Sequence, residues 1–259
     1  MTQNRFFGLQ TFEPIPDEWA ATIAAKGWGR VRVEGTRYDE LMAQCQKYSL
    51  WPLWILRRGQ EATVPSGIDV EIGNECNAGC APDWPKMTPT EYAAWVSEAA
   101  PSLLGRGNTV YVGAANNTSP SGIEWTRDVL ARLTDLPQLR VSFHRYPDPD
   151  QDPLKPKKGY RTLADEDAAI LDCVKGRRWA ISEAGLVDVT YRDWSSWKYF
   201  GKRRTRLAVD GHRTQAARFK RLGADWYCVY QLNSSATEHY GIRRLDETWT
   251  ASADLPGLL

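Results

Sequence analysis

The feature that most limits the possible folds of this chain is a regular alternation of short apolar runs with longer amphipathic stretches. Eight short runs, most of them rich in Val, Ile and aromatic residues and bounded by Gly, Pro or Asn, are typical of strands. These runs are Phe6–Phe12, Gly29–Gly35, Leu50–Leu56, Asp69–Asn74, Thr109–Ala114, Leu139–Tyr146, Arg178–Ala184 and Trp226–Leu232. Strands that alternate with helices pair in parallel through right-handed crossovers, so the pattern predicts an α/β fold.

Helical spacing of apolar residues occurs in six of the stretches between these runs. They are Asp17–Lys26, Tyr38–Lys47, Thr88–Leu104, Ser121–Thr134, Leu163–Val174 and Gly211–Leu222. The best-marked start is Thr88-Pro89-Thr90-Glu91, which combines a capping box with proline at the first helical position. The third connection, Arg57 to Ile68, contains glycines and a proline and is too short for a full crossover helix. The tail after Asn233 also has a weak helix signal.

Eight strand units in a chain of this length fit a closed (β/α)8 barrel, or TIM barrel, better than an open doubly wound sheet. The chain has 259 residues, and such barrels take about 250 residues as one domain. An open sheet would favour a Gly-rich phosphate-binding turn after a strand, whereas Gly105–Asn108 precedes one. No linker, repeat or low-complexity segment divides the chain. We therefore expect residues 1–259 to form a single compact domain with a short third crossover and a weak eighth helix.

Charge and apolar content exclude several classes of partner. The chain has 33 Lys and Arg against 32 Asp and Glu, a net charge of +1, and 42% hydrophobic residues. This balance is ordinary for a globular protein and lacks the basic excess of a nucleic-acid binder. The longest apolar runs, such as Leu50–Leu56, are far shorter than the roughly 20 residues of a membrane helix. We expect no nucleic-acid or membrane partner.

The N-terminal segment and the cysteines bear on the compartment. Met1–Gly8 lacks the apolar segment and cleavage site of a signal peptide, so we expect a cytoplasmic chain or one released by a non-classical route. The five cysteines, at positions 45, 76, 80, 173 and 228, show no Cys-x-x-Cys and no zinc spacing. We expect reduced thiols and no metal, with a local disulfide or a metal site at Cys76 and Cys80 as the alternatives.

In a (β/α)8 barrel, functional side chains lie at the C-terminal ends of the strands. The fourth run ends in Asn74-Glu75 and the seventh in Ser182-Glu183, so two distant strand ends each deliver one carboxylate. Apolar strands usually end in turn residues rather than in single glutamates. Because adjacent residues of a regular strand face opposite sides, Asn74 and Glu75 both reach the barrel mouth only if the strand bulges or ends there.

Motifs at these strand ends resemble those of clan A of the glycoside hydrolases, which are retaining glycosidases on a (β/α)8 barrel. The four motifs are Asn74-Glu75, His144-x-Tyr146, Ser182-Glu183-x-Gly185 and Tyr240-Gly241-Ile242. The segment Gly73–Asn77 followed by Thr88–Ala93 is also similar to the acid/base segment and following helix of several families in the clan. Each motif alone is weak, but the set follows the chain in order at consistent strand ends.

The resemblance implies a role for each of these residues. Glu75 is the general acid/base, which needs a pKa raised by burial and by a neighbouring anion. Glu183 is the nucleophile, which must be ionised, and a retaining pair lies about 5–5.5 Å apart. The remaining roles fall to Arg32 and Tyr146 as partners of Glu183, Asn74 at the sugar 2-hydroxyl, and His144 at the acid/base region or a substrate hydroxyl. Arg30, or a structural ion pair, remains the alternative to Arg32.

The chain departs from the family pattern at two positions. Cys76 stands where a proline often follows the acid/base glutamate. Tyr230-Gln231 stands where the eighth strand usually ends in a tryptophan under the sugar, so we expect Tyr230 to be a smaller platform.

The chain contains 12 tryptophans, an unusual number. Most of them lie on predicted helices or strands and are expected to pack the barrel. Trp84, Trp194 and Trp197 follow the fourth and seventh runs, and we expect them to stack on sugar rings. For Trp194 and Trp197 the alternative is a loop that packs its own aromatic side chains. The basic segments Lys155–Lys158 and Lys202–Arg206 either form solvated surface or attract an anionic glycan.

The sequence therefore predicts a retaining glycoside hydrolase that cleaves a β-linked oligo- or polysaccharide through a covalent glycosyl-enzyme intermediate. Carbohydrate is the expected partner, and no cofactor is expected. One alternative is a non-catalytic glycan-binding or structural barrel, for instance a component of a larger particle. A further alternative is a barrel lyase or isomerase that uses Glu75 and Glu183 for proton transfer.

Overall fold

A computed structural model describes residues 4–11, 15–33, 38–80, 84–146, 155–185, 201–230 and 256–257 of the chain. Its eight strands form one closed barrel in chain order, with every neighbouring pair parallel and β1 paired to β8. The strands are β1 (Asn4–Thr11), β2 (Trp28–Val33), β3 (Trp51–Leu56), β4 (Asp69–Ile72), β5 (Thr109–Ala115), β6 (Arg140–His144), β7 (Trp179–Ala184) and β8 (Tyr227–Val229). This confirms the predicted (β/α)8 barrel, and each strand lies within its predicted run or within two or three residues of it.

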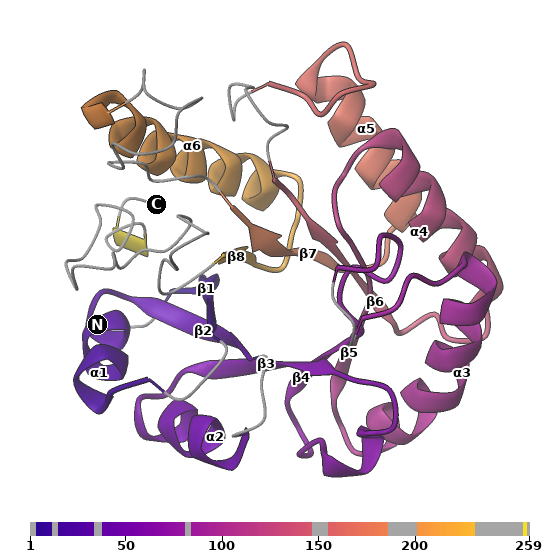
Figure 1. The fold of residues 1–259 in the computed structure, drawn as a ribbon, viewed down its shortest axis with the longest axis horizontal. Coiled ribbons are helices and arrows are strands. Elements are labelled where there is room, and N and C mark those ends of the chain that lie inside the picture. The colour runs from indigo at the N-terminus through magenta and orange to yellow at the C-terminus, as the bar shows by residue number, and fades with distance from the viewer. Residues whose placement is uncertain are drawn as a thin grey trace.

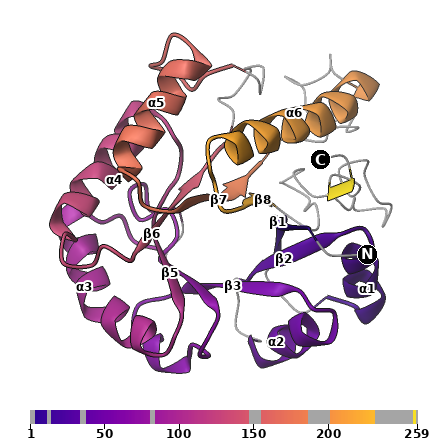
Figure 2. The same ribbon diagram turned by 180° about the vertical axis from the view of Figure 1, so that it is seen from behind.

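Helices surround the barrel, as both views of the ribbon show (Figures 1 and 2). They are α1 (Asp17–Ala25), α2 (Tyr38–Lys47), α3 (Pro89–Gly105), α4 (Pro120–Arg132), α5 (Leu163–Val174) and α6 (Gly201–Arg221). The third connection contains only a short 3-10 turn, η1 (Glu61–Thr63), so the prediction of a curtailed crossover is confirmed. The predicted tail after Asn233 lies outside the described residues, except for 256–257.

Helix α6 differs from its prediction, because it begins at Gly201 rather than at Gly211. The sequence predicts a helix boundary at Gly211, yet this glycine is buried inside the helix. Tertiary packing there outweighs the low helix propensity of glycine. The basic segment Lys202–Arg206 therefore belongs to the first turns of α6 and is not a loop.

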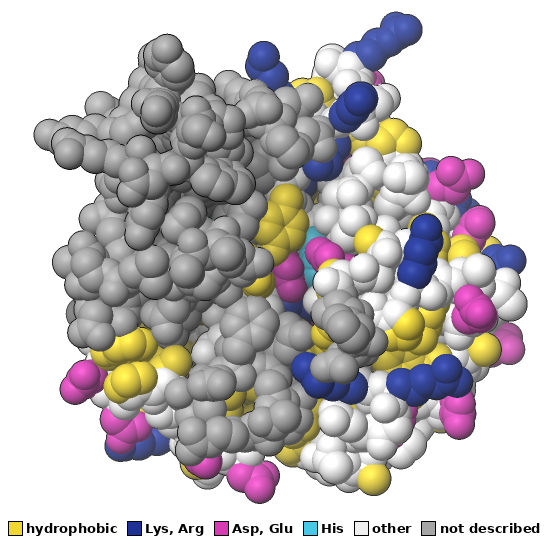
Figure 3. Space-filling model, viewed as in Figure 1, with side chains coloured by type: hydrophobic (Ala, Val, Ile, Leu, Met, Phe, Trp, Pro, Cys, Tyr) yellow, Lys and Arg dark blue, Asp and Glu magenta, His cyan; other side chains and the backbone are white. Residues whose placement is uncertain are grey.

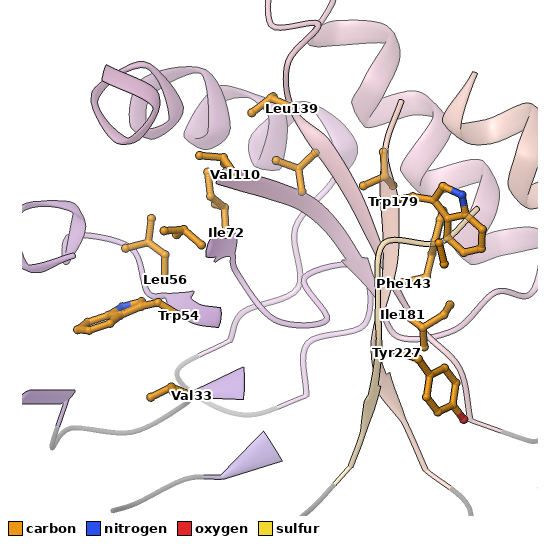
Figure 4. Packing of buried hydrophobic residues seen from close by; sticks show 14 of the residues in the cluster. Val33, Trp54, Leu56, Ile72, Val110, Leu139, Phe143, Trp179, Ile181 and Tyr227 are labelled. Atoms are coloured by element: carbon orange, nitrogen blue, oxygen red, sulfur yellow. The ribbon is translucent and has the colours of Figure 1, made fainter. Parts of the chain in front are cut away.

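The apolar core lies between the barrel and its helices. Figure 4 shows its side chains, with Trp54, Ile72 and Trp179 among them, pointing outward from the strands. In β4, Val70 and Ile72 belong to this core, while the alternate residues Asp69 and Glu71 contact arginines across the barrel. Strand periodicity therefore separates an apolar outer layer from a charged interior.

The interior of the barrel is unusual because ion pairs replace much of the branched apolar packing that such barrels usually have. Arg30 pairs with Asp69, and Arg32 pairs with Glu71. The apolar residues of the interior form one small buried cluster: Leu53, Tyr111, Ala180, Trp226 and Cys228. Arg30 lies over the ring of Trp226, 5.5 Å from its centroid. The two ion pairs, Arg30–Asp69 and Arg32–Glu71, thus lie at two successive levels along the barrel axis.

Two further predictions can be compared with the described residues. No disulfide joins any of the five cysteines, all of which are described, so the alternative of a bridge at Cys76 and Cys80 is wrong. None of the helices in the described ranges has the length and apolar content that crossing a membrane requires.

Candidate active site

The end of β4 brings Asn74 and Glu75 to the same side of the barrel. The strand ends at Ile72, and both Gly73 (φ +76°) and Glu75 (φ +49°) adopt left-handed backbone conformations. A Cβ on Gly73 would lie 2.7 Å from Cys76 Sγ, so this turn requires glycine as well as the positive φ. The chain therefore leaves the sheet here, as the sequence predicted.

Neighbouring groups fix this turn. The Glu75 N–H donates to the carbonyl oxygen of Ala114 at 3.0 Å, beside a bulge at the end of β5. Tyr92 of α3, fully buried, donates its hydroxyl to the Ile72 carbonyl and accepts from the Gly113 N–H at 3.1 Å. The tyrosine hydroxyl thus replaces a ladder bond between β4 and β5 and lets Glu75 turn toward the barrel mouth.

Glu183, at the end of β7, is held through both carboxylate oxygens. Arg32 Nη1 donates to Oε1, and Tyr146 donates its hydroxyl to Oε2 at 2.6 Å. His144 Nδ1 lies 3.3 Å from the same Oε2. The Glu183 side chain is 5% exposed. Arg32, and not Arg30, is therefore the arginine at Glu183, which the sequence had left open.

Arg32 is fully surrounded and joins several strands. Its Nε donates to Glu71 Oε2 at 2.7 Å, its Nη1 to Gln10 Oε1 at 2.5 Å, and its Nη2 to Asn74 Oδ1 at 2.8 Å. Sequence reasoning missed Glu71 and Gln10. The signal available in the sequence was the alternation of side chains along a strand. Asp69 and Glu71 occupy alternate positions of β4 and so share one face, as Arg30 and Arg32 do on β2. Charged residues buried in one barrel are expected to pair.

His144 connects the two glutamates. Its Nδ1 lies 2.8 Å from Glu75 Oε1, while its Nε2 lies 3.3 Å from Arg32 Nη2. A guanidinium can only donate hydrogen bonds, so Nε2 faces a donor, whereas Nδ1 faces carboxylates. The proton of the neutral imidazole therefore belongs on Nδ1, and the protonated form keeps it there.

The pKa values of this group follow from these contacts. Burial would raise the pKa of Glu75, but the hydrogen bond from His144 and the charges of His144 and Arg32 together lower it below the usual 4.5. Burial would lower the pKa of His144, but the charges of Glu183 and Glu75 raise it above 6.5. Burial and the neighbouring Glu183 raise the pKa of Tyr146 well above 10, so it stays a donor.

This result corrects the expectation that Glu75 has a raised pKa. The sequence argument considered burial and a neighbouring anion, but it did not place the imidazole of His144 in contact with the carboxylate. In this structure the proton of the Glu75–His144 pair therefore resides on His144 Nδ1.

The two carboxylates and the imidazole form one cluster. One oxygen each of Glu75 and Glu183 and one nitrogen of His144 lie within 4.8 Å of one another. The Glu75 side chain is 17% exposed, whereas that of His144 is fully buried. Figure 3 shows a histidine and acidic side chains at the bottom of a hollow near the middle of this face. Glu75 is thus the carboxylate most open to an incoming molecule.

Such a cluster also has the donor types that bind a divalent metal. Coordination by His144 Nδ1 would require that atom to lose its proton, and the remaining proton would then sit on Nε2. In this structure Nδ1 lies 2.8 Å from Glu75 Oε1, a hydrogen-bond distance, so the Nδ1 proton occupies the position that a metal ion would need.

The other predicted site residues divide into three groups. Tyr230 lies at the site, with its ring 5.9 Å from that of Tyr146 and its N–H bonded to the Ala184 carbonyl. Trp84 is only 3% exposed, and Arg57 lies over its ring at 5.4 Å, so the expectation of an open sugar platform there is wrong. Trp194 and Trp197 lie outside the described residues.

One further residue of the site was missed by the sequence analysis. Cys80 Sγ lies 3.4 Å from the Asn74 side-chain nitrogen, and the Cys80 side chain is hydrogen-bonded to Glu75. The only signal for Cys80 in the sequence is its nearness to Glu75 in the chain.

Comparison with known families and proteins finds likeness in structure alone. No family model matches the chain, and no curated protein matches it. A family 39 glycoside hydrolase from Bacteroides cellulosilyticus WH2 superposes with a TM-score of 0.65 at 12% identity, covering 98% of this chain and 62% of that one. The chain thus spans less than two thirds of that enzyme.

Two other structures match this chain over nearly the full length of both. A broad-specificity endoglucanase of family GH5-4 from Clostridium acetobutylicum has a TM-score of 0.66 at 14% identity, covering 97% of this chain and 96% of that one. A family 17 β-1,3-glucanosyltransferase from Rhizomucor miehei has a TM-score of 0.65 at 12% identity, covering 95% and 96%. The chain therefore has the closed (β/α)8 barrel fold of the clan A glycoside hydrolases.

Proposed function

We propose that this chain is a retaining glycoside hydrolase that cleaves a β-linked oligo- or polysaccharide by double displacement, with residues 1–259 as its catalytic domain. The observation that carries the proposal is the pair Glu75 and Glu183, which reach one hollow from β4 and β7 with oxygens within 4.8 Å. Retaining enzymes place their carboxyl groups about 5–5.5 Å apart, whereas inverting enzymes leave a wider gap for water. A purely structural barrel has no need of this approach between two carboxylates.

In the first step, an oxygen of Glu183 attacks the anomeric carbon and forms a glycosyl ester. The electron pair of the broken glycosidic bond stays on the leaving oxygen, which takes a proton. Arg32 and Tyr146 hold the Glu183 carboxylate in one orientation, which places its oxygens for the attack. No cofactor takes part in this chemistry.

The proton for the leaving oxygen comes from the Glu75–His144 pair. In the resting site His144 is the imidazolium, because the charges of Glu183 and Glu75 raise its pKa, and its Nδ1 carries this proton 2.8 Å from Glu75 Oε1. A sugar that fills the hollow removes water from Glu75, which disfavours the carboxylate and moves the proton onto it. His144 is left as a neutral imidazole with its remaining proton on Nε2. The two residues therefore act as one acid with a shared proton.

In the second step, Glu75 acts as the general base. It takes a proton from water, the water oxygen attacks the anomeric carbon, and Glu183 leaves as a carboxylate. Asn74 belongs near the sugar 2-hydroxyl, because Arg32 holds its Oδ1 and fixes the amide at the barrel mouth. Tyr146 and Tyr230 offer aromatic surface beside Glu183. A sugar-stacking role for Trp194 and Trp197 remains part of the proposal.

The substitutions Glu75→Gln and Glu183→Gln test the proposal on an aryl β-glycoside that the wild type cleaves. Loss of a general acid/base or nucleophile lowers turnover by about a hundredfold to ten-thousandfold or more. Glu98→Gln, an exposed glutamate on α3, is the matched control and should keep wild-type turnover. Near-wild-type turnover of either site variant would contradict the assignment.

The same experiment addresses the non-catalytic alternative. A wild type that binds β-linked oligosaccharides but cleaves none of a panel of them, judged by mass analysis of products, would favour a glycan-binding barrel over an enzyme.

A further inference from the structure

We infer that Asn77 and Asn116 form the binding site for a sugar in the leaving group, so that the substrate carries a second sugar unit on the far side of the scissile bond. The inference rests on the proposed function and goes beyond it. It assigns a pair of residues that neither the motifs nor the proposed mechanism uses.

The two amides form a reciprocal pair. Asn77 Nδ2 donates to Asn116 Oδ1 at 2.8 Å, and the Asn116 backbone N–H donates to Asn77 Oδ1 at 2.9 Å. Asn117 Nδ2 also donates to Asn116 Oδ1 at 2.9 Å. Asn117 is itself held by Ser119, whose N–H donates to its Oδ1 at 2.9 Å. The pair is therefore fixed before any ligand arrives, which reduces the entropy lost on binding.

This network leaves hydrogen-bond donors unused. The side-chain oxygen of Asn116, Oδ1, already accepts two hydrogen bonds, so the orientation of the side-chain amide is set. Within the described ranges its Nδ2 has no hydrogen-bond partner, and the side chain is partly exposed. Asn77 is likewise partly exposed and uses one N–H of its Nδ2 on Asn116. The pair therefore presents three unused N–H donors.

The position of the pair decides which part of a substrate it meets. Asn77 lies two residues after Glu75, and Asn116 lies two residues after Ala114, whose carbonyl accepts the Glu75 N–H. The partners of Glu183 come from other parts of the barrel, because Arg32 lies on β2 and Tyr146 lies just after β6. The leaving oxygen must take its proton from Glu75, so the leaving group lies against Glu75 and reaches this pair.

The chemistry of the pair selects its ligand. Neutral N–H donors fixed a short distance apart suit the hydroxyl oxygens of a sugar ring, which accept such bonds and cost less to dehydrate than a charged group. An aryl leaving group offers no such oxygens. The pair therefore favours a sugar over an aromatic group on the leaving side.

The experiment compares two substrates in one variant. Asn116→Ala is assayed on cellotriose and laminaritriose, and on the 4-nitrophenyl β-glycosides of the same sugars. Loss of one or two neutral hydrogen bonds should lower kcat/KM for the oligosaccharide about tenfold. Turnover of the aryl glycoside should stay within about twofold of wild type, which also shows that the variant is folded. Asn77→Ala should show the same selective loss.

Gln138→Ala provides the matched control, because Gln138 is an exposed amide just before the start of β6, at the opposite end of the barrel. It should leave both substrates unaffected. Equal losses on both substrates, or no loss on the oligosaccharide, would overturn the inference while leaving the proposed function intact. A wild type that cleaves neither these substrates nor any other β-linked oligosaccharide of a panel would contradict the proposed function, and the inference would then be overturned as well.

Discussion

The barrel interior contains two ionic networks that differ in how their charges are matched. The lower network, at the N-terminal ends of the strands, consists of Arg30, Asp69, Arg140 and Asp225, with the solvent-exposed Arg178 at its edge. The upper network, at the C-terminal ends, consists of Arg32, Glu71, Glu75, His144 and Glu183. The lower network has three arginines for two carboxylates, whereas the upper has one arginine for three.

This difference in charge matching indicates a structural role for the lower network and a chemical role for the upper network. In the lower network Asp225 has two arginine partners, Arg140 at 3.0 Å and Arg178 at 2.6 Å, and Tyr111 donates to it as well. In the upper network Arg32 serves Glu71 and Glu183 together, and Glu75 depends on His144. Surplus negative charge in a buried place is balanced by a proton, and a proton held in this way is available for catalysis.

The largest expected effect comes from removing the arginine of the upper network. Arg32→Met leaves Glu71 and Glu183 buried without their shared cation, so the free energy of unfolding should fall by about 3–5 kcal/mol and turnover by at least about a hundredfold. Arg30→Met should cost less than half as much stability and leave kcat unchanged. Urea unfolding and steady-state kinetics measure both quantities.

Arg32→Lys serves as the milder variant if Arg32→Met does not fold. Lysine keeps the positive charge but lacks the planar guanidinium that reaches several partners at once. Turnover should therefore still fall, while the free energy of unfolding should be closer to wild type than in Arg32→Met. Equal effects of Arg30→Met and Arg32→Met on turnover would erase the distinction between the two networks.

The same tyrosine substitution in each network gives a smaller and more selective effect. Tyr146→Phe removes the hydroxyl that donates to Glu183, and one hydrogen bond to a charged group is worth about 1.5–3 kcal/mol, so turnover should fall about tenfold to a hundredfold. Tyr111→Phe removes the hydroxyl that accepts from Trp226 Nε1 and donates to Asp225. It should lower stability by about 1–3 kcal/mol and leave turnover unchanged. A loss of activity in the Tyr111 variant would show that the lower network is not merely structural.

The smallest expected effect is a pH dependence of stability that differs between two buried histidines. The pKa of His144 is raised above 6.5, so its contribution is complete below pH 6.5 and is lost as the pH rises through the raised value. The lowered pKa of Glu75 makes its contribution complete above pH 4.5 and lost at more acidic pH. The pair therefore stabilises most between about pH 4.5 and 6.5.

The pH dependence of stability that His212 contributes has the opposite sign to that of His144. Burial lowers its pKa to about 3, so the folded chain excludes a proton that the unfolded chain binds, and stability falls as the pH drops below 6.5. Unfolding of His144→Asn and His212→Asn across the pH range should show differences from wild type that change in opposite directions. Parallel changes would contradict the proton assignment at His144.

Much of the fold and part of the site follow from local patterns in the sequence. The strands are short apolar runs between breakers, and barrel closure brings their C-terminal ends together whatever their separation in the chain. Barrel closure explains why the two glutamates meet, whereas the grouping of Arg32, His144 and Tyr146 with Glu183 followed from the family resemblance of the strand-end motifs. The end of β4 before Asn74 and Glu75 was also predictable, because these two adjacent residues had to face one hollow.

Other features depend on contacts between distant residues, which a local pattern does not specify. The lowered pKa of Glu75 results from the 2.8 Å approach of His144, which no spacing in the sequence indicates. Trp84 looks like an exposed loop aromatic, but it is covered by Arg57 from a different connection. Parity along β4 marks Glu71 as a residue of the barrel interior, but its pairing with Arg32 follows from the register of β2, β3 and β4.

The central claim is that Glu183 forms a covalent bond to the sugar. Glu75, which shares a proton with His144, protonates the leaving oxygen and then takes a proton from water. The most direct measurement is mass spectrometry of the chain after incubation with an activated 2-fluoro β-glycoside of a sugar that the enzyme cleaves. The account predicts a mass increase of one fluoroglycosyl unit on the peptide that contains Glu183, and no such adduct in Glu183→Gln. An adduct on another residue, or the absence of any adduct from an enzyme that cleaves the parent glycoside, would contradict it.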